Sequence, residues 1–353
     1  MMAYLVISDV LLYLAVSLLA GLAVMQFVPV HRKPVITISK VFVGMAIAAI
    51  PIFTAAPVLQ LVLLLTETAS IAESVKIALT EFRIGQSLLI SLALSSLWWM
   101  ILIFNGSKYI QALLLLFSVV TIGYGSHSAA VEFWPGVLSH AVHVLTISLW
   151  AGVLLLVAWF SPNLTNWREF LRWFTPFAFS LMGIIFLSGF LVMLLFSAPT
   201  DYANSWVLPY GQMLLLKHLT IFPLLVAAML NGFAIKKKEP SKTLLRLEAF
   251  MLLAIFFFTA MMSKLAPPHD ISKTFATEGP APFLGLFSSM QQLPVNAQMA
   301  FSLDGALLVV IGIVCFVFFI LSIGRKLHGM FGSIFALLFV FFVYVGLMMN
   351  LKF

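Results

Sequence analysis

The sequence predicts an all-α membrane protein, a polytopic transmembrane helical bundle of about ten spans. Hydrophobic residues make up 63% of the 353-residue chain, and charged residues make up only 9%. Soluble domains contain roughly 25% charged residues, so this composition excludes an ordinary soluble domain. The mean hydropathy of +1.13 agrees with that exclusion. The bundle is expected to lie within a lipid bilayer.

Apolar segments that approach or exceed the roughly 20 residues of a helical span recur along the chain. They lie at 5–29, 41–65, 87–104, 109–125, 137–160, 175–197, 211–234, 244–265, 303–323 and 331–351. We therefore expect an eight-helix membrane core over 1–266, an outer loop over 267–302 and two additional helices over 303–353. Residues 1–8 contain no Lys or Arg, so the first helix is not expected to be a cleaved signal peptide.

The basic residues predict the orientation of the helices. Thirteen of them, including Lys33, Lys40 and Lys108, fall in one set of alternate connections and five in the other, while Lys217 falls inside a span. The positive-inside rule places the richer set in the cytoplasm and both termini outside. Cytoplasmic loops thus account for the formal net charge of +7, and no nucleic-acid partner is expected.

The outer side of this topology is acidic and contains the longest connection. Asp201, Asp270 and Glu278 lie there and would raise the local concentration of cations, although the same pattern also follows from the positive-inside bias alone. The Pro- and Gly-rich connection 266–302 is long enough to be functional or mobile. The connection 67–86 interleaves charged and apolar residues, which is typical of an amphipathic surface helix.

Three histidines form the strongest chemical signal. His127 lies in a polar loop before the break Trp134-Pro135-Gly136, and an apolar helix with His140 and His143 follows. Two residues three apart lie on neighbouring parts of one helical face. From a helix start near 137, the pair lies roughly 5 and 9 Å inside the span. Ionisable residues at such depth are candidates for a functional site.

A second histidine lies at comparable depth. His218 is about 10 Å inside the span that starts near 211, and Met213 lies close to the start of the same span. Neutral imidazole binds Cu, Zn, Fe and Ni, and the methionine thioether favours Cu(I). Hydrogen-bonded packing between helices is the alternative for the histidines, and gap filling is the alternative for Met213. The single cysteine, Cys315, excludes an intramolecular disulfide and a Cys-pair metal motif.

Lys217 precedes His218 inside the span. A buried ammonium needs a partner, for which Asp9, Asp201 and Glu132 are the candidates. A cation beside a metal would repel it, so Lys217 either faces away or balances an anionic ligand.

Motifs in this part of the chain resemble the copper-resistance D (CopD) family, in which a histidine pair precedes an L-W-x-G-G segment. The resemblance covers roughly residues 120–268. Its motifs, in chain order, are His127-Ser, His140-Ala-Val-His143, Leu149-Trp150-Ala-Gly152, Phe174-Thr-Pro-Phe, Ser188-Gly189, Leu208-Pro-Tyr-Gly-Gln-Met-Leu-Leu-Leu-Lys-His, Asn231-Gly-Phe, Arg246-Leu-Glu248 and Leu265-Ala-Pro-Pro. Val153 departs from the family by replacing the second glycine of L-W-x-G-G, and His218 is not a family position.

The resemblance implies a multi-pass protein of the bacterial cytoplasmic (inner) membrane that handles copper, in uptake or in copper resistance. Members of the family often work with a small extracellular or periplasmic copper-binding β-domain (CopC). We expect no such domain in this chain, and the resemblance then allows a separate CopC-like partner. The oligomeric state is not predicted.

Three interpretations follow. The first is a copper permease with metal ligands His127, His140, His143, His218 and Met213 and with Trp150, Lys217, Asp9 and Glu132 in supporting positions. No ATPase motif and no catalytic residue is assigned, which favours a transporter over an enzyme. The second is an electron carrier or metalloreductase with haem b, because paired intramembrane histidines can be axial ligands. The third is a copper-delivery factor for a respiratory oxidase.

Overall fold

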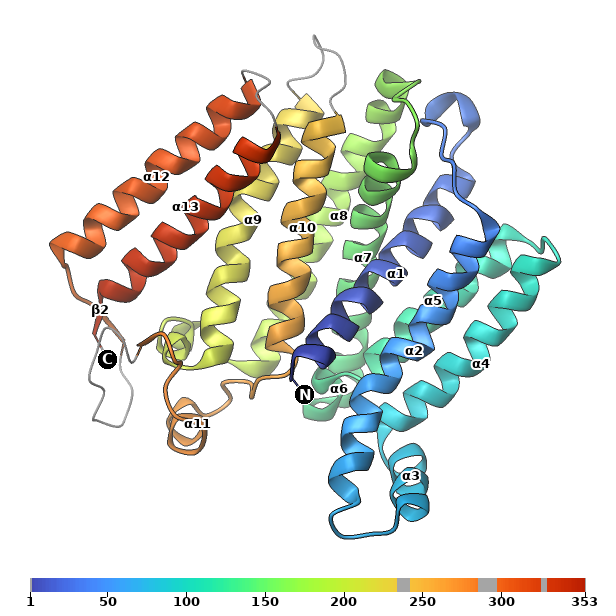
Figure 1. Ribbon diagram of the computed structural model, residues 1–353, viewed down its shortest axis with the longest axis horizontal. Coiled ribbons are helices and arrows are strands. Elements are labelled where there is room, and N and C mark those ends of the chain that lie inside the picture. The colour runs from blue at the N-terminus through green and yellow to red at the C-terminus, as the bar shows by residue number, and fades with distance from the viewer. Residues whose placement is uncertain (1, 234–241, 285–296, 325–328, 353) are drawn as a thin grey trace. The chain divides into compact units, whose positions relative to one another are not determined.

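The computed structural model describes residues 2–233, 242–284, 297–324 and 329–352 (Figure 1). It confirms the all-α class expected of a polytopic membrane protein. Within these ranges, nine helices are long and apolar enough to cross a membrane. The remaining expected span is a shorter apolar helix of 17 residues, Lys108–Tyr124, which is at the lower limit for a span.

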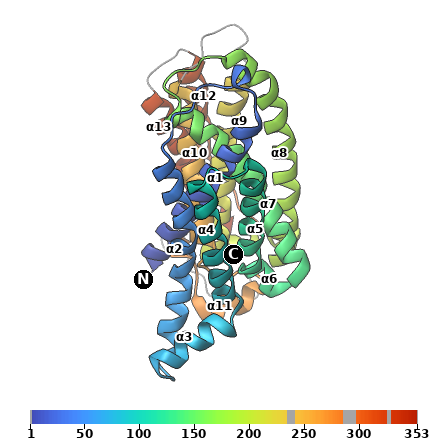
Figure 2. The same cartoon turned by 90° about the vertical axis from the view of Figure 1, so that its right-hand side faces the viewer.

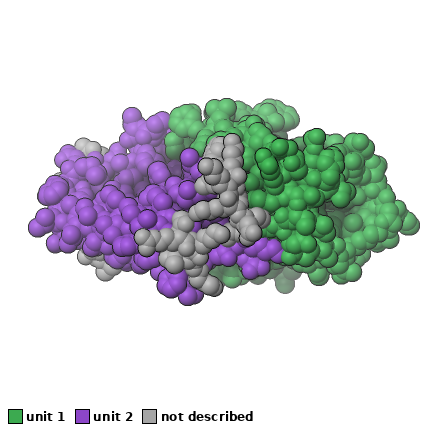
Figure 3. Space-filling model, turned by 90° about the horizontal axis from the view of Figure 1, so that it is seen from above, with its two compact units in different colours: residues 1–195 green, residues 196–353 purple. Residues whose placement is uncertain are grey.

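The chain divides into two compact units, Met1–Leu195 and Phe196–Phe353, which Figure 3 shows in different colours. These two units are defined by how the residues pack. The division expected from hydropathy, into a core over 1–266, a loop over 267–302 and two additional helices over 303–353, stays a prediction. The helices of the first unit are α1 (Met2–Phe27), η1 (Val30–Arg32), α2 (Lys40–Leu65), α3 (Ile71–Thr80), α4 (Arg83–Ile103), α5 (Lys108–Tyr124), α6 (His127–Val131), α7 (Phe133–Phe160) and α8 (Trp167–Phe196).

The first unit depends on a close contact between α1 and α7. A Cβ atom on Gly21 would lie 2.3 Å from the carbonyl carbon of Gly152, and one on Gly152 would lie 1.8 Å from the carbonyl oxygen of Ser17. Small residues let helix backbones approach in this way, and packing of this kind drives helix association in a bilayer, where lipid is as apolar as leucine. Gly152 of the Leu-Trp-Ala-Gly motif therefore has a packing role.

The long helices of the first unit place their connections at two opposite ends. The expected amphipathic helix is present as α3, beyond the ends of α2 and α4 and at the end of the unit where α1 begins (Figures 1 and 2). The core that joins these helices contains Val16, Ile47, Ile50 and Trp98, each at most 2% exposed.

The second unit contains two pairs of long helices. Its elements are η2 (Pro199–Asp201), η3 (Asn204–Val207), α9 (Pro209–Phe233), α10 (Lys242–Met262), α11 (Ile271–Glu278), β1 (Gln298–Met299), α12 (Leu303–Gly324), α13 (Gly329–Met349) and β2 (Leu351–Lys352). The Tyr344 hydroxyl of α13 donates a hydrogen bond of 2.6 Å to Oε1 of Gln212 in α9. The two C-terminal helices thus share a core with α9.

Several sequence-based boundaries were wrong. His127 does not lie in a loop but begins α6. Trp134-Pro135-Gly136 is not a break, because α7 begins at Phe133; Pro135 is the third helical residue, where the backbone N–H has no partner within the helix. Helix α8 begins at Trp167 rather than near 175, with Pro176 inside it.

The expected outer loop contains regular structure in its described part. Helix α11 occupies Ile271–Glu278, and the Asp270 side chain caps it by accepting a 2.9 Å hydrogen bond from the Lys273 amide. The two-residue strand β1 pairs with β2 at the end of the chain. Residues 285–296 of this connection lie outside the described residues.

Candidate metal-binding histidines

A compact turn positions His127 just before α7. Ser126 caps α6, its Oγ accepting a hydrogen bond from the Ala129 amide at 3.3 Å. Arg83 donates a 2.7 Å hydrogen bond to the Ala129 carbonyl and lies 4.6 Å from the centre of the Phe133 ring. His127 is exposed on this turn. The next residue after α6, Glu132, is the exposed N-cap position of α7.

His140 and His143 are half-buried on α7. Because the helix starts at Phe133, they lie about 10 and 15 Å along its axis, further than the sequence indicated. Deeper in the same helix, Trp150 is 5% exposed, and Asp9 of α1 is 9% exposed. These two predicted supporting residues are therefore buried within the first unit.

Helix α8 holds the His143 ring through a hydroxyl group. Nδ1 of His143 lies 3.1 Å from Ser188 Oγ. The serine hydroxyl itself donates to the Ile184 carbonyl at 2.6 Å, which uses its single proton. When the hydroxyl proton is used in this way, Nδ1 of a neutral His143 is the donor to Ser188, and the lone pair of the ring lies on Nε2. This is how a ligating histidine is oriented by a partner behind it.

Gly189 allows the ring to approach α8. A Cβ at this position would lie 3.0 Å from His143 Cε1 and 3.4 Å from Nδ1, which is too tight for an unshifted ring. The Ser-Gly pair thus combines a polar partner with space for imidazole. The sequence motif contained this pair, but only the helix packing shows that it faces His143.

A groove of about 450 Å³ lies between α7 and α8 beside this contact. Its wall on α7 includes Leu138, Ser139 and Val142, and its wall on α8 includes Leu187 and Ser188. Ser139 donates to its own helix, to the Pro135 carbonyl at 2.6 Å. The groove is thus mainly apolar, with the His143-bound hydroxyl of Ser188 in its lining.

In the second unit, the Tyr202 hydroxyl forms a hydrogen bond with His218. Nδ1 of His218 in α9 lies 2.7 Å from the Tyr202 hydroxyl, and the two ring centres are 5.6 Å apart. Tyr202 lies outside the spans and packs against Trp206 at 5.4 Å, edge to face. Burial raises the pKa of Tyr202 to about 12, so its phenol keeps its proton at neutral pH and can donate to His218 Nδ1.

Other predicted residues of the second unit are arranged differently. Met213 and Lys217 are half-buried in α9. Met213 lies five residues from His218, or about 140° around the helix axis, so the two do not share a face. Asp201 accepts a 3.3 Å hydrogen bond from the Asn204 side chain, and Asp270 and Glu278 are exposed at either end of α11.

The described part of the chain contains no group of three or more His, Cys, Asp or Glu side chains placed to hold a metal ion. His127, His140 and His143 are thus not gathered into one such cluster, and their role as joint ligands stays a prediction. The same holds for any site that combines them with Met213 or His218 of the second unit. Sequence reasoning did not identify the roles of Ser188 and Tyr202, because serine and tyrosine near histidine carry no specific pattern.

Comparison with known proteins gives one informative similarity. The chain is 28% identical over 187 residues to a protein of Bacillus subtilis (strain 168) named Copper transport protein CutJ. The matched region covers 49% of this chain and 34% of that protein, so the match spans about a third of the relative's length. No family model matches the chain, and no solved structure matches it.

Proposed function

We propose that this polytopic membrane protein handles copper, as a permease that takes the ion from the outer face through a histidine site in the outer half of the membrane. The observation that carries the proposal is the 187-residue similarity to a protein named for copper transport. The family resemblance of the histidine and Ser-Gly motifs agrees with it. The proposed location is the bacterial cytoplasmic membrane.

The chemistry of the His143 contact supports this role. With Nδ1 donating to Ser188, the ring presents a neutral Nε2, which is a donor atom that copper accepts. His140 lies almost one turn before it on α7, and His127 begins α6 at the end of the unit where α7 starts. In the proposal, these histidines receive copper from the outer side, with copper as cargo rather than as a resident cofactor.

The acidic residues Asp201, Asp270 and Glu278 would attract cations to the outer face in this scheme. A separate CopC-like copper-binding protein would be the donor. Translocation would be driven by the copper gradient, the membrane potential or ligand exchange, since the sequence shows no ATPase motif.

Metal content tests the proposal. Detergent-purified wild type, a His140→Ala/His143→Ala variant and a control variant of the exposed His31, His31→Ala, are loaded with Cu(I) and with Cu(II) and analysed by mass spectrometry. We expect near-stoichiometric copper in the wild type and the control, and loss of copper in the double variant. Flux into liposomes then tests transport.

Two outcomes contradict the proposal. Equal copper in the wild type and the double variant would exclude the α7 histidines as the site. Iron with a Soret absorption band would instead favour the haem-binding electron carrier.

A further inference from the structure

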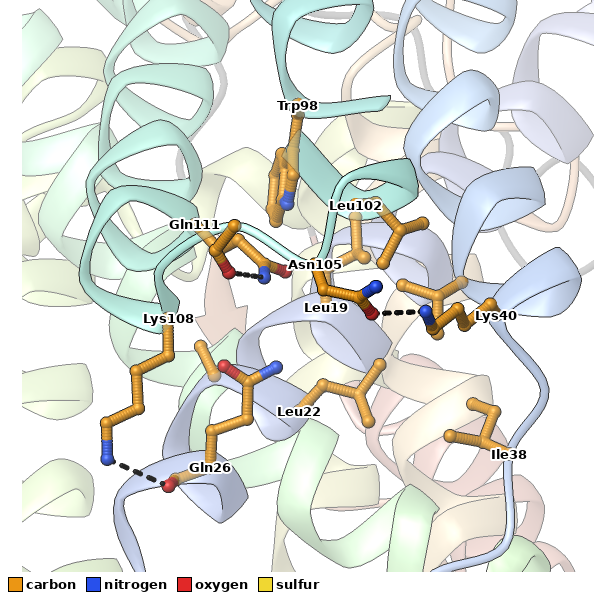
Figure 4. A pocket seen from close by; sticks show the side chains of 13 residues that line it. Leu19, Leu22, Gln26, Ile38, Lys40, Trp98, Leu102, Asn105, Lys108 and Gln111 are labelled. Atoms are coloured by element: carbon orange, nitrogen blue, oxygen red, sulfur yellow. Dashed lines mark hydrogen bonds between the residues drawn. The ribbon is translucent and has the colours of Figure 1, made fainter. Parts of the chain in front are cut away.

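A cavity with both apolar and polar lining residues lies at the end of the first unit where α1 and α4 end and α2 and α5 begin (Figure 4). Its volume is about 440 Å³. It is far along α1 from Asp9, since it is lined by residues of the last two turns, such as Leu22 and Gln26. The proposed copper site does not use it.

The polar groups that line this cavity are rich in hydrogen-bond donors. They comprise two ammonium groups and three carboxamides, contributed by Lys40, Lys108, Gln26, Asn105 and Gln111. None of its lining residues is acidic. Ammonium groups only donate hydrogen bonds, and carboxamide NH₂ groups donate two. The cavity therefore suits a ligand with several acceptor oxygens.

Among the described residues, the ammonium groups of Lys40 and Lys108 contact only neutral groups. Lys40 donates to Asn105 Oδ1, and Lys108 donates to the Gln26 carbonyl at 3.4 Å and lies 4.7 Å from the centre of the Phe27 ring. In the part of the chain that the structure describes, neither lysine of the cavity has a carboxylate partner. Their positive charge is thus available to an anion.

A third lysine adds to the positive charge at this end. The Lys33 ammonium donates to the Met25 carbonyl, one residue before Gln26. Burial and then the neighbouring charge of Lys108 lower the pKa of Lys33. An anion in the cavity would relieve this repulsion between like charges.

The buried floor contains a donor without an acceptor. Trp98 is 2% exposed, and in the described structure its indole Nε1 is buried with no hydrogen-bond partner. In Figure 4 the indole nitrogen is at the end of the ring nearest Asn105 and Gln111. Indole N–H can only donate, and a buried polar group of this kind normally has a partner. An acceptor oxygen in the cavity would supply one.

The backbone at Asn105 helps to form the site. Asn105 adopts a left-handed conformation with φ of 52°, which asparagine tolerates better than most residues. The following Gly106 amide donates to the Ile101 carbonyl at 2.8 Å, ending α4. This turn directs the Asn105 carboxamide toward Lys40 (Figure 4).

We propose that this cavity binds a phosphate group, held by Lys40 and Lys108 with the Trp98 indole N–H beneath it. Two sources share this chemistry, the headgroup of an anionic phospholipid and free inorganic phosphate. The expected topology puts the cavity at the cytoplasmic surface, where basic pockets between transmembrane helices bind anionic headgroups.

Native mass spectrometry of the delipidated full chain tests the proposal. The probes are phosphatidylglycerol, phosphatidylcholine and inorganic phosphate. The variants are Lys40→Gln/Lys108→Gln and, as a control with the same change of charge, Lys76→Gln/Lys273→Gln, which alters exposed lysines of α3 and α11. Trp98→Phe is a third variant that removes the indole donor without changing charge.

We expect the wild type and the control to bind phosphatidylglycerol or inorganic phosphate. The cavity variant should bind the same probe at least about tenfold more weakly, a difference of about 1.4 kcal/mol. Trp98→Phe should weaken binding by a smaller factor. Retention of phosphatidylglycerol that inorganic phosphate does not displace identifies a lipid headgroup. Binding of inorganic phosphate but not of phosphatidylglycerol, together with a higher melting temperature in phosphate, identifies free phosphate as the ligand.

Other results would overturn the proposal. These are equal binding by the cavity variant and the control, or equal retention of phosphatidylcholine and phosphatidylglycerol. Loss of binding in the cavity variant supports the proposal when that variant elutes as a monodisperse protein with the melting temperature of the control. Trp98→Phe tests the same cavity without a change of charge. Copper content is measured in parallel, because the cavity and the α7 histidines are expected to act independently.

Discussion

His143 in the first unit and His218 in the second are half-buried imidazoles, and a hydroxyl oxygen lies beside Nδ1 of each, at 3.1 and 2.7 Å. We infer that these two hydrogen bonds run in opposite directions. The Ser188 hydroxyl is placed to donate to the Ile184 carbonyl, and in that arrangement His143 Nδ1 is the donor to Ser188. The Tyr202 phenol, whose pKa burial raises to about 12, donates to His218 Nδ1.

The consequence concerns the lone pair that a metal would need. In His143 the lone pair is on Nε2, on the opposite side of the ring from Ser188. In His218 the lone pair is on Nδ1 and already accepts from Tyr202, while Nε2 carries hydrogen. Metal binding at His218 would first require the loss of that hydrogen bond or a change of tautomer. On this inference His143, rather than His218, is the expected ligand, although the sequence places both at similar depth.

The largest effect is expected from a change that moves α7 itself. Gly152→Ala would place a Cβ 1.8 Å from the Ser17 carbonyl oxygen, forcing α1 and α7 apart, and overpacking typically costs about 1–3 kcal/mol. We expect a lower melting temperature and loss of copper, measured by thermal unfolding in detergent and by mass spectrometry. The matched control is Gly183→Ala in α8, where an added Cβ meets nothing within 4 Å. Equal behaviour of the two variants would contradict the close contact.

The next largest effect should separate the two histidines directly. We expect His143→Ala to weaken copper binding by at least about tenfold, or 1.4 kcal/mol, because it removes the Nε2 ligand. His218→Ala should leave copper affinity within about twofold, a change of less than 0.5 kcal/mol. Competition with a chelator of known affinity measures both. A larger loss in His218→Ala than in His143→Ala would reverse the comparison.

A smaller effect is expected from the hydroxyl partners. Ser188→Ala leaves His143 in place but removes the group that orients it, so we expect a loss of copper affinity below that of His143→Ala, toward the lower end of the roughly 10- to 100-fold that such changes cost. Tyr202→Phe removes the donor to His218 Nδ1 and should not reduce copper binding. Chelator competition on both variants, with Ser180→Ala in α8 as a control at an exposed serine, distinguishes the two roles. Reduced copper binding in Tyr202→Phe would indicate that His218 contributes to copper binding and that the Tyr202 hydroxyl supports it.

The sequence predicted the helices well because about 20 consecutive apolar residues have few stable arrangements other than a span. It failed where residues that usually indicate a boundary lie inside a helix, namely Trp134-Pro135-Gly136 of α7 and the charged residues at the start of α8. Proline and glycine usually indicate a boundary, but proline in a first helical turn loses no hydrogen bond within the helix. Boundaries of this kind depend on packing that the local sequence does not contain.

The candidate site was predictable only as a set of residue types. The spacing of His140 and His143 indicated a shared helical face, but Ser188 is 45 residues from His143, and its contact depends on how α8 packs on α7. The tautomer depends further on the Ile184 carbonyl. The Trp98 cavity was not expected at all, since its lining residues come from separate helices and their connections.

The smallest predicted effect is a pH dependence of the Tyr202–His218 contact. A phenol with a raised pKa keeps its proton in the folded protein, so the contact is fully present below the ordinary value near 10 and is lost as the pH rises through about 12. Ultraviolet absorbance of tyrosinate, taken as the difference between wild type and Tyr202→Phe, measures this ionisation. We expect no Tyr202 signal at pH 10 and half of it near pH 12. A full signal by pH 10 would mean that the phenol is not buried, and the assignment of the lone pair of His218 to this contact would lose its basis.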